Sequence, residues 1–107
     1  MSFRVDIVSP ETVAWSGEAD FLLARTTEGD IGILTDHEPF LGLLATGAVK
    51  VRSDSRQVII GVHGGFLQVY RNQVTLLTER AEIAEGDIEE ARRIAEELAE
   101  EEAAAQD

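Results

Sequence analysis

The chain has 107 residues, of which 44% are hydrophobic and 28% charged, with no cysteine and a formal net charge of −12. This length makes one domain, or one domain with an appendage, and the composition is that of a folded protein. The lack of cysteine excludes disulfides, thiolate nucleophiles and cysteine metal sites, and the short, interrupted apolar stretches exclude a membrane span.

Negative charge is concentrated near the C-terminus. Residues 1–84 hold seven basic and eleven acidic residues, a net charge of −4, whereas residues 85–107 hold two and ten, a net charge of −8. Such a protein repels phosphates and anionic lipids, so neither nucleic acid nor a bare membrane surface is an expected partner. A basic protein surface is a better match.

Apolar and polar residues alternate with a period of two from residue 3 to about residue 84, which predicts β-strands with one buried and one wet face. Glycine, asparagine and aspartate turns separate short runs at close spacing, as in an antiparallel sandwich or barrel. The predicted strands cover residues 3–7, 12–15, 19–25, 31–34, 40–44, 48–52, 56–62, 66–70 and 74–78.

Three turns carry specific backbone expectations. Pro10 separates the first two strands, because a central strand would not accept proline. The pair Gly64–Gly65 predicts a bend with positive φ, and Asn72 suits the left-handed conformation of a hairpin loop. The polar run Thr26–Asp30 is interpreted as a turn before the strand that begins at Ile31.

The period changes at residue 87. Asp87 and Glu90 form a pattern typical of a capping box, and an apolar stripe of Ile88, Ala91 and Leu98 follows at helical spacing. We therefore predict a β-sandwich domain over residues 1–84 and a short acidic helix with a frayed tail over residues 85–107.

No group of residues favours catalysis. His63 before the two glycines lacks the Gly-x-Ser-x-Gly nucleophile motif that a hydrolase would need, so a strand bend is the simpler interpretation. His37, between Asp36 and Glu38, lacks metal-ligand spacing and fits an exposed loop. We expect no enzymatic activity, no metal and no cofactor.

Several short motifs nevertheless occur together in a family order. The motifs are Val8-Ser9, Trp15-Ser16-Gly17, Glu28 to Leu34, His37-x-Pro39, Gly47-x-Val49, Gly64 to Val69 and Val74 to Leu77. In that order and at that spacing, over residues 3–98, the chain resembles the epsilon subunit of F-type ATP synthases.

The resemblance implies a sandwich of about ten strands and a place in the central stalk, the rotor of the enzyme. There the subunit packs on gamma, rests on the c-ring and helps couple proton flow to rotation and ATP synthesis. It implies a peripheral location on the cytoplasmic face of a bacterial cell membrane, reached only through the complex.

The resemblance also implies particular contact residues. Glu28, Gly29 and Asp30 match the loop that touches the c-ring, and exposed carboxylates there can pair with ring arginines. Ser9 and His37 match positions near gamma. A solvated turn charge remains an equally good interpretation of Glu28 alone.

The C-terminal segment departs from the family. Many members continue into two helices that can block the catalytic head of alpha and beta subunits, whereas residues 85–107 have room for one, so we expect inhibition to be weak or absent. Some members bind ATP through a short motif at the start of this helix. This chain has the arginine of that motif at Arg92, but it has Glu89 in place of the motif's aspartate and Arg93 in place of its alanine. We interpret Glu89 and Arg92 as a remnant in which a helix ion pair is favoured over ATP binding.

A second function remains open at this point. The same small sandwich can be a stand-alone protein-binding module, unrelated to a rotary enzyme. Co-purification with gamma and the ring distinguishes the two, since only the rotor subunit requires both partners.

Overall fold

The alternating sequence folds into ten strands. The computed structural model describes residues 2–54 and 56–84, so the helix predicted from Asp87, together with Glu89 and Arg92, lies outside the described residues. The strands are β1 Phe3–Val8, β2 Val13–Ala19, β3 Phe21–Thr26, β4 Gly29–Ile33, β5 Phe40–Leu43, β6 Gly47–Ser53, β7 Arg56–His63, β8 Phe66–Tyr70, β9 Gln73–Leu77 and β10 Arg80–Ala84.

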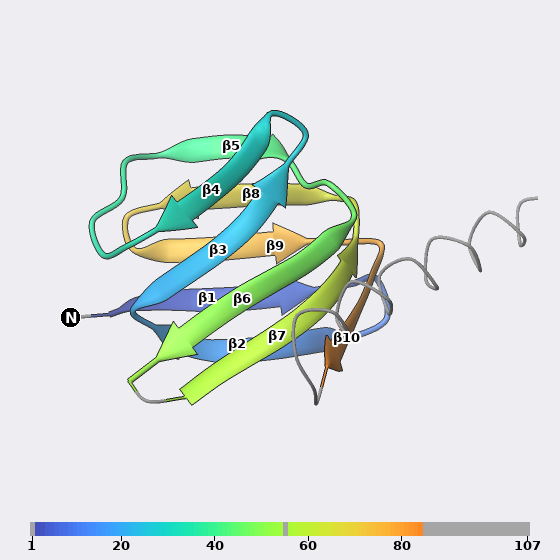
Figure 1. The fold of residues 1–107 in the computed structure, drawn as a ribbon, viewed down its shortest axis with the longest axis horizontal. Helices are drawn as coiled ribbons and strands as arrows, with labels where there is room; N and C mark the ends of the chain where they lie inside the picture. Colours follow the sequence, from blue (N-terminus) through green and yellow to red (C-terminus); the bar gives the residue numbers. More distant parts are fainter. Residues whose placement is uncertain (1, 55, 85–107) are drawn as a thin grey trace, which may run out of the picture.

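The strands form two five-stranded sheets that stack face to face (Figure 1). Sheet 1 has the order β2-β1-β9-β8-β5, and sheet 2 has the order β10-β7-β6-β3-β4. In Figure 1 sheet 2 lies in front, and its strands run obliquely across those of sheet 1. The fold is therefore the predicted β-sandwich.

One pairing differs from the antiparallel prediction. Among the described strands, every pair is antiparallel except β1 with β9, which is parallel. The paired positions Val5 and Val74 are 69 residues apart in the sequence. Alternation reports which residues share a face and says nothing of strand direction, because the period of two is the same in both kinds of pair.

The core lies between the sheets and follows the alternation. Phe3, Val5 and Ile7 are 2%, 0% and 0% exposed, whereas Arg4 between them is exposed. Burying each such apolar side chain stabilises the fold by roughly 1.5–3 kcal/mol. The other fully buried large side chains are Leu22, Ile33, Val49, Val51, Ile60, Val62, Leu67, Val74 and Leu76.

Several boundaries differ from those predicted. Strand β2 extends to Ala19 instead of ending at residue 15, so Ala19, predicted to begin the next strand, belongs to β2. The predicted turn Thr26–Asp30 is shorter in the structure, because Gly29 and Asp30 already belong to β4 and pair with Thr26 and Arg25. The last strand, β10, was not delimited by the alternation. It pairs with β7 at the edge of sheet 2.

The predicted bend at Gly64–Gly65 is confirmed, with φ values of 60° and 110°. A Cβ at residue 64 would meet nothing within 4 Å, whereas a Cβ at residue 65 would lie 1.9 Å from the carbonyl oxygen of Leu77. Gly65 therefore allows the β7–β8 connection to pass directly against the end of β9. The predicted left-handed conformation of Asn72 is also confirmed, with φ of 61°.

This contrast gives a test of the fold with a matched control. In Gly64→Ala the added methyl group meets no other atom, and the only cost is the positive φ of residue 64. We therefore expect a loss of about 1–2 kcal/mol in the free energy of unfolding. Gly65→Ala adds a backbone clash to comparable strain, so its loss should exceed about 3 kcal/mol. Urea unfolding of both variants measures the difference, and equal losses would contradict the close approach at Leu77.

Candidate functional site

The turn between β3 and β4 holds Glu28, and a buried hydroxyl fixes it. Thr26 is 8% exposed. Its Oγ1 accepts a hydrogen bond from the Glu28 N–H at 3.1 Å and donates one to the Gly29 carbonyl at 2.8 Å. Because the threonine side chain bonds both ends of the turn, the backbone at Glu28 has a defined course. We call Thr27, Glu28, Gly29 and Asp30 the acidic turn.

The two carboxylates of the acidic turn differ in their partners. Asp30 Oδ1 lies 3.1 Å from Arg25 Nε on the paired strand, and both side chains are 59% exposed. An ion pair so exposed stabilises the fold by at most about 1 kcal/mol. Within residues 2–54 and 56–84 no ion pair involves Glu28, so its charge is the one left available to a partner.

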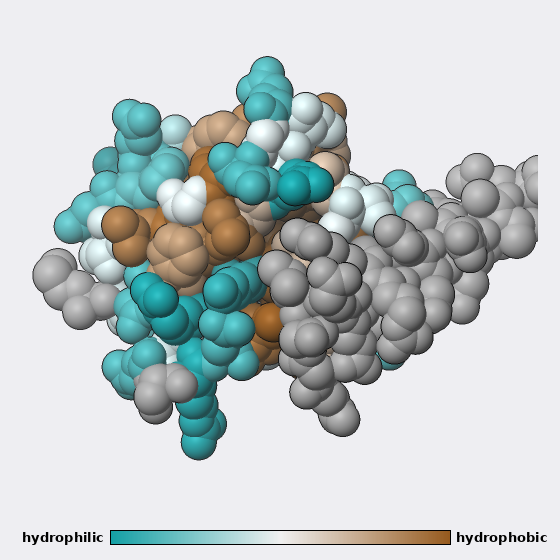
Figure 2. All heavy atoms as spheres, viewed as in Figure 1, coloured by the Kyte–Doolittle hydropathy of each residue, from teal (hydrophilic) through white to brown (hydrophobic). Residues whose placement is uncertain are grey.

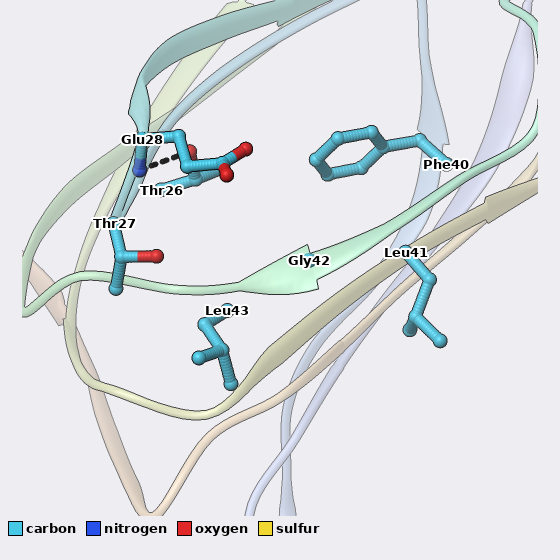
Figure 3. Close-up of a pocket in the computed structure, with 7 residues that line it drawn as sticks. All are labelled: Thr26, Thr27, Glu28, Phe40, Leu41, Gly42 and Leu43. Carbon is cyan, nitrogen blue, oxygen red and sulfur yellow. Dashed lines mark hydrogen bonds between the residues drawn. The ribbon is translucent and has the colours of Figure 1, made fainter.

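A hollow of about 240 Å³ separates the acidic turn from β5 (Figure 3). Figure 3 shows the Glu28 carboxylate and the Phe40 ring on opposite sides of it, extending toward each other over Gly42. A Cβ at residue 42 would lie 2.7 Å from Cζ of Phe40, so the glycine lets the ring lie over the strand. The lining residues are Thr26, Thr27, Glu28, Phe40, Leu41, Gly42 and Leu43.

The outer face of sheet 1 carries a line of apolar side chains across all five strands. The register pairs Val13 with Val8, Val8 with Leu77, Leu77 with Phe66, and Phe66 with Leu43. Val8 is half-buried, and the other four side chains are 50–57% exposed. We call Val8, Val13, Leu43, Phe66 and Leu77 the apolar row.

The remainder of that face is mostly polar around Asp6, with Leu41 and Tyr70 exposed on β5 and β8. The carboxylate accepts hydrogen bonds from the hydroxyl of Ser16, from Nε2 of Gln73 at 2.8 Å and from the guanidinium of Arg4 at 3.2 Å. These donors, Ser16 first, hold the pKa of Asp6 below its ordinary value of 3.8. The outer face of sheet 1 is thus apolar at one end and hydrogen-bonded and charged further along.

The outer side of sheet 2 is different. In Figure 2, viewed from that side, hydrophobic side chains gather over the middle of the sheet and hydrophilic ones surround them. Phe21 there is half-buried, and the guanidinium of Arg52 lies 5.0 Å from its ring centroid. A basic side chain therefore lies against one residue of this apolar surface, whereas no cation–ring contact is present at the apolar row among the described residues.

The structure brings some predicted contact residues to one end of the sandwich. The Thr27 N–H donates to the Leu43 carbonyl at 3.0 Å, and the Thr78 N–H donates to the Val8 carbonyl at 2.9 Å. The acidic turn and Ser9 therefore both lie at the end of sheet 1 that carries the apolar row. The acidic turn is on the β5 side of that end, and Ser9 is on the β1 side.

His37 lies at the other end of sheet 1. Its loop is fixed by Asp36, whose N–H donates to Asn72 Oδ1 at 2.7 Å and whose Oδ1 accepts from Asn72 Nδ2 at 2.9 Å. Nδ1 of His37 lies 2.7 Å from the Glu38 carbonyl. Ser9 and His37 thus lie in loops at opposite ends of sheet 1.

Residues 2–84 match the family model described as the ATP synthase delta/epsilon chain β-sandwich domain. The chain belongs to this family. It is 49% identical over 84 residues to the ATP synthase epsilon chain of Frankia casuarinae, covering 78% of this chain and 99% of that relative. It is 46% identical over 83 residues to the epsilon chain of Streptomyces avermitilis, covering 77% and 67%.

Two solved structures share the fold of this epsilon-family chain. A chain in the Euglena gracilis mitochondrial ATP synthase has a TM-score of 0.74 and 24% identity, covering 95% of this chain and 64% of that one. A chain in the central stalk and c-ring of the Tetrahymena thermophila enzyme has a TM-score of 0.62 and 18% identity, covering 73% and 63%. This chain thus spans slightly less than two thirds of either. At these identities the likeness shows the fold alone.

The sequence motifs predict the acidic turn but not the apolar row or the hollow. The missed signal lies where apolar residues occupy both parities of a strand, as at Leu43–Leu44 and Leu76–Leu77. In each pair one residue fills the core and the other must face outward. No comparable sequence signal brings Phe40 to Glu28, because they belong to different sheets.

The hydrogen bonds of Asp6 predict a pH dependence. A depressed pKa contributes stability that is fully present above the unfolded value of about 3.8 and is lost as pH falls through the lower folded value. At pH 6 we expect Asp6→Asn to lower the free energy of unfolding by about 1 kcal/mol. Below pH 3.8 the difference from the parent chain should shrink.

Urea titrations at pH 6, 4 and 3 measure this difference. Glu11→Gln removes a carboxylate that belongs to no described ion pair or side-chain hydrogen bond, so it is the matched control. A difference for Asp6→Asn that stays constant or grows at low pH would contradict the hydrogen-bonded carboxylate.

Proposed function

We propose that this chain is the epsilon-type rotor subunit of a proton-translocating F-type ATP synthase, joining gamma to the c-ring without catalysing a reaction. The observation that carries the proposal is the family match over residues 2–84, with relatives named ATP synthase epsilon chain at close to 50% identity.

The stand-alone binding module is not favoured, since the match covers the whole described sandwich. No helix among the described residues could span a bilayer. The proposed location is peripheral, on the cytoplasmic face of the cell membrane.

The outer face of sheet 1 is the proposed gamma surface. Contiguous exposed apolar side chains on a small domain mark a protein interface, and an interface centre is more apolar than its rim. The apolar row supplies such a centre. Ser9 and His37, the two residues assigned to gamma, lie at opposite ends of sheet 1, so a partner that spans the length of this face would reach both.

The acidic turn is the proposed c-ring surface. It lies at one end of the sandwich, beside the apolar row and tied to Leu43 by the Thr27 hydrogen bond. A subunit seated where gamma meets the ring needs its two contact surfaces next to each other. Glu28 and Asp30 supply exposed negative charge for basic groups of the ring, and Gly29, with φ of 129°, permits a close backbone approach.

The gamma surface is tested by placing a charge in the apolar row. Phe66→Asp should weaken binding of the full chain to purified gamma by about 30-fold or more, because an interface anchor contributes about 2 kcal/mol or more. Phe66 is 50% exposed, so the variant should keep its fold. Calorimetry with purified gamma measures the affinity, and circular dichroism checks the fold.

Gln68→Glu is the matched control. Gln68 lies on the same strand and is exposed, but the register places it opposite Leu41 and Thr75, outside the apolar row. It should change the affinity by less than about threefold. The assignment of this face would be overturned if Phe66→Asp and the parent chain bound gamma equally well, or if the chain joined the ATP synthase complex in the absence of gamma.

A further inference from the structure

The hollow beside the acidic turn is too small for a nucleotide or a comparable ligand. Its volume of about 240 Å³ lies below the roughly 300–1,000 Å³ typical of small-molecule sites. It is open at the end of the sandwich where the acidic turn is exposed, so it suits one side chain of an approaching partner.

The walls of the hollow select the chemistry of that side chain. One wall is the Glu28 carboxylate, and the opposite one is the Phe40 ring, as Figure 3 shows. No basic residue lines the space, and the chain as a whole carries a net charge of −12. A carboxylate and an aromatic ring both attract a cation, the first by charge and the second by the electron-rich face of its π system.

The backbone of each wall is held in place before a partner arrives. The Thr26 hydroxyl fixes the backbone of Glu28, and the Thr27 N–H bonds the Leu43 carbonyl at 3.0 Å. Phe40 is half-buried against the core and lies over Gly42, which has no side chain to displace the ring. The backbone around the hollow therefore needs little ordering when the hollow is filled.

Between the two biological cations, the walls favour arginine. A guanidinium is planar, weakly hydrated, stacks on an aromatic ring and pairs with a carboxylate through two parallel hydrogen bonds. A lysine ammonium is a strongly hydrated point charge and gains less from the ring.

We propose that the hollow is a socket for one arginine side chain of the partner surface, with Glu28 as its charge partner and Phe40 as its aromatic wall. Gly42 is the positioning residue that lets the ring lie there. The proposal rests on the proposed function in one respect: the partner surface is the one that the acidic turn meets in the complex. It adds to the acidic turn a specificity for arginine and two residues, Phe40 and Gly42, that the turn does not contain.

The socket is tested on the full chain with two small probes, acetyl-arginine amide and acetyl-lysine amide, followed by NMR. Saturable shifts of the Phe40 ring signals are expected with the arginine probe, and at least twofold weaker binding with the lysine probe. Phe40→Leu should weaken arginine binding by about two- to fivefold and abolish the preference over lysine. Glu28→Gln should weaken both probes by a similar factor.

Two further variants separate geometry from composition. Gly42→Ala keeps every wall residue but pushes the ring aside, so it should lose the arginine preference as Phe40→Leu does. Glu11→Gln, which lies outside the hollow, should bind both probes as the parent chain does. The proposal is overturned by arginine and lysine probes of equal affinity, by Glu28→Gln binding like the parent, or by Gly42→Ala keeping the preference.

The same variants distinguish this failure from that of the proposed function. Phe40→Leu and Glu28→Gln leave the apolar row intact and should bind gamma like the parent chain. Loss of the arginine preference in a chain that still binds gamma would overturn the socket alone. A chain that prefers arginine but does not bind gamma would overturn the proposed function alone.

Discussion

The fold depends on the mutual burial of two sheet faces. Because side chains alternate along a strand, each residue that fills the core assigns its neighbours to the outside. Across five strands the register then aligns outward residues into rows. The apolar row is such an alignment: Val8, Leu77 and Phe66 face outward because Ile7, Leu76 and Leu67 are in the core. A shift by one residue would exchange the two sets, so the core that stabilises the sandwich also determines its outer surface.

The same dependence explains how much of the structure could be predicted from the sequence. The strands, the Gly64–Gly65 bend and the conformation of Asn72 are local, and local patterns specify them. The parallel pairing of β1 with β9 depends on a partner distant in the chain, as does the position of β10. The extension of β4 to Gly29 comes instead from its tight hairpin with β3, which the polar run Thr26–Asp30 did not indicate. The hollow is the extreme case, because Glu28 and Phe40 meet only when the sheets stack.

The polar part of sheet 1 gives the proposed gamma surface a direction. The Asp6 carboxylate accepts hydrogen bonds from side chains of the same protein, so it requires little hydrogen bonding from a partner. The apolar row has no such internal partner and gains most from leaving water. A face with these two ends binds a partner more strongly in one orientation than in the reverse one. Sheet 2 lacks this asymmetry where Arg52 covers Phe21.

Strand β5 connects the two proposed surfaces. Leu43 belongs to the apolar row and also lines the hollow, and its carbonyl bonds the Thr27 N–H of the acidic turn. A partner on the outer face of sheet 1 and an arginine in the socket would therefore press on the same short strand from two sides. Because β5 is a four-residue edge strand that pairs only with β8, occupation of either surface would restrict its position for the other. In the proposed function, the two contact surfaces would thus be coupled through one edge strand and one hydrogen bond.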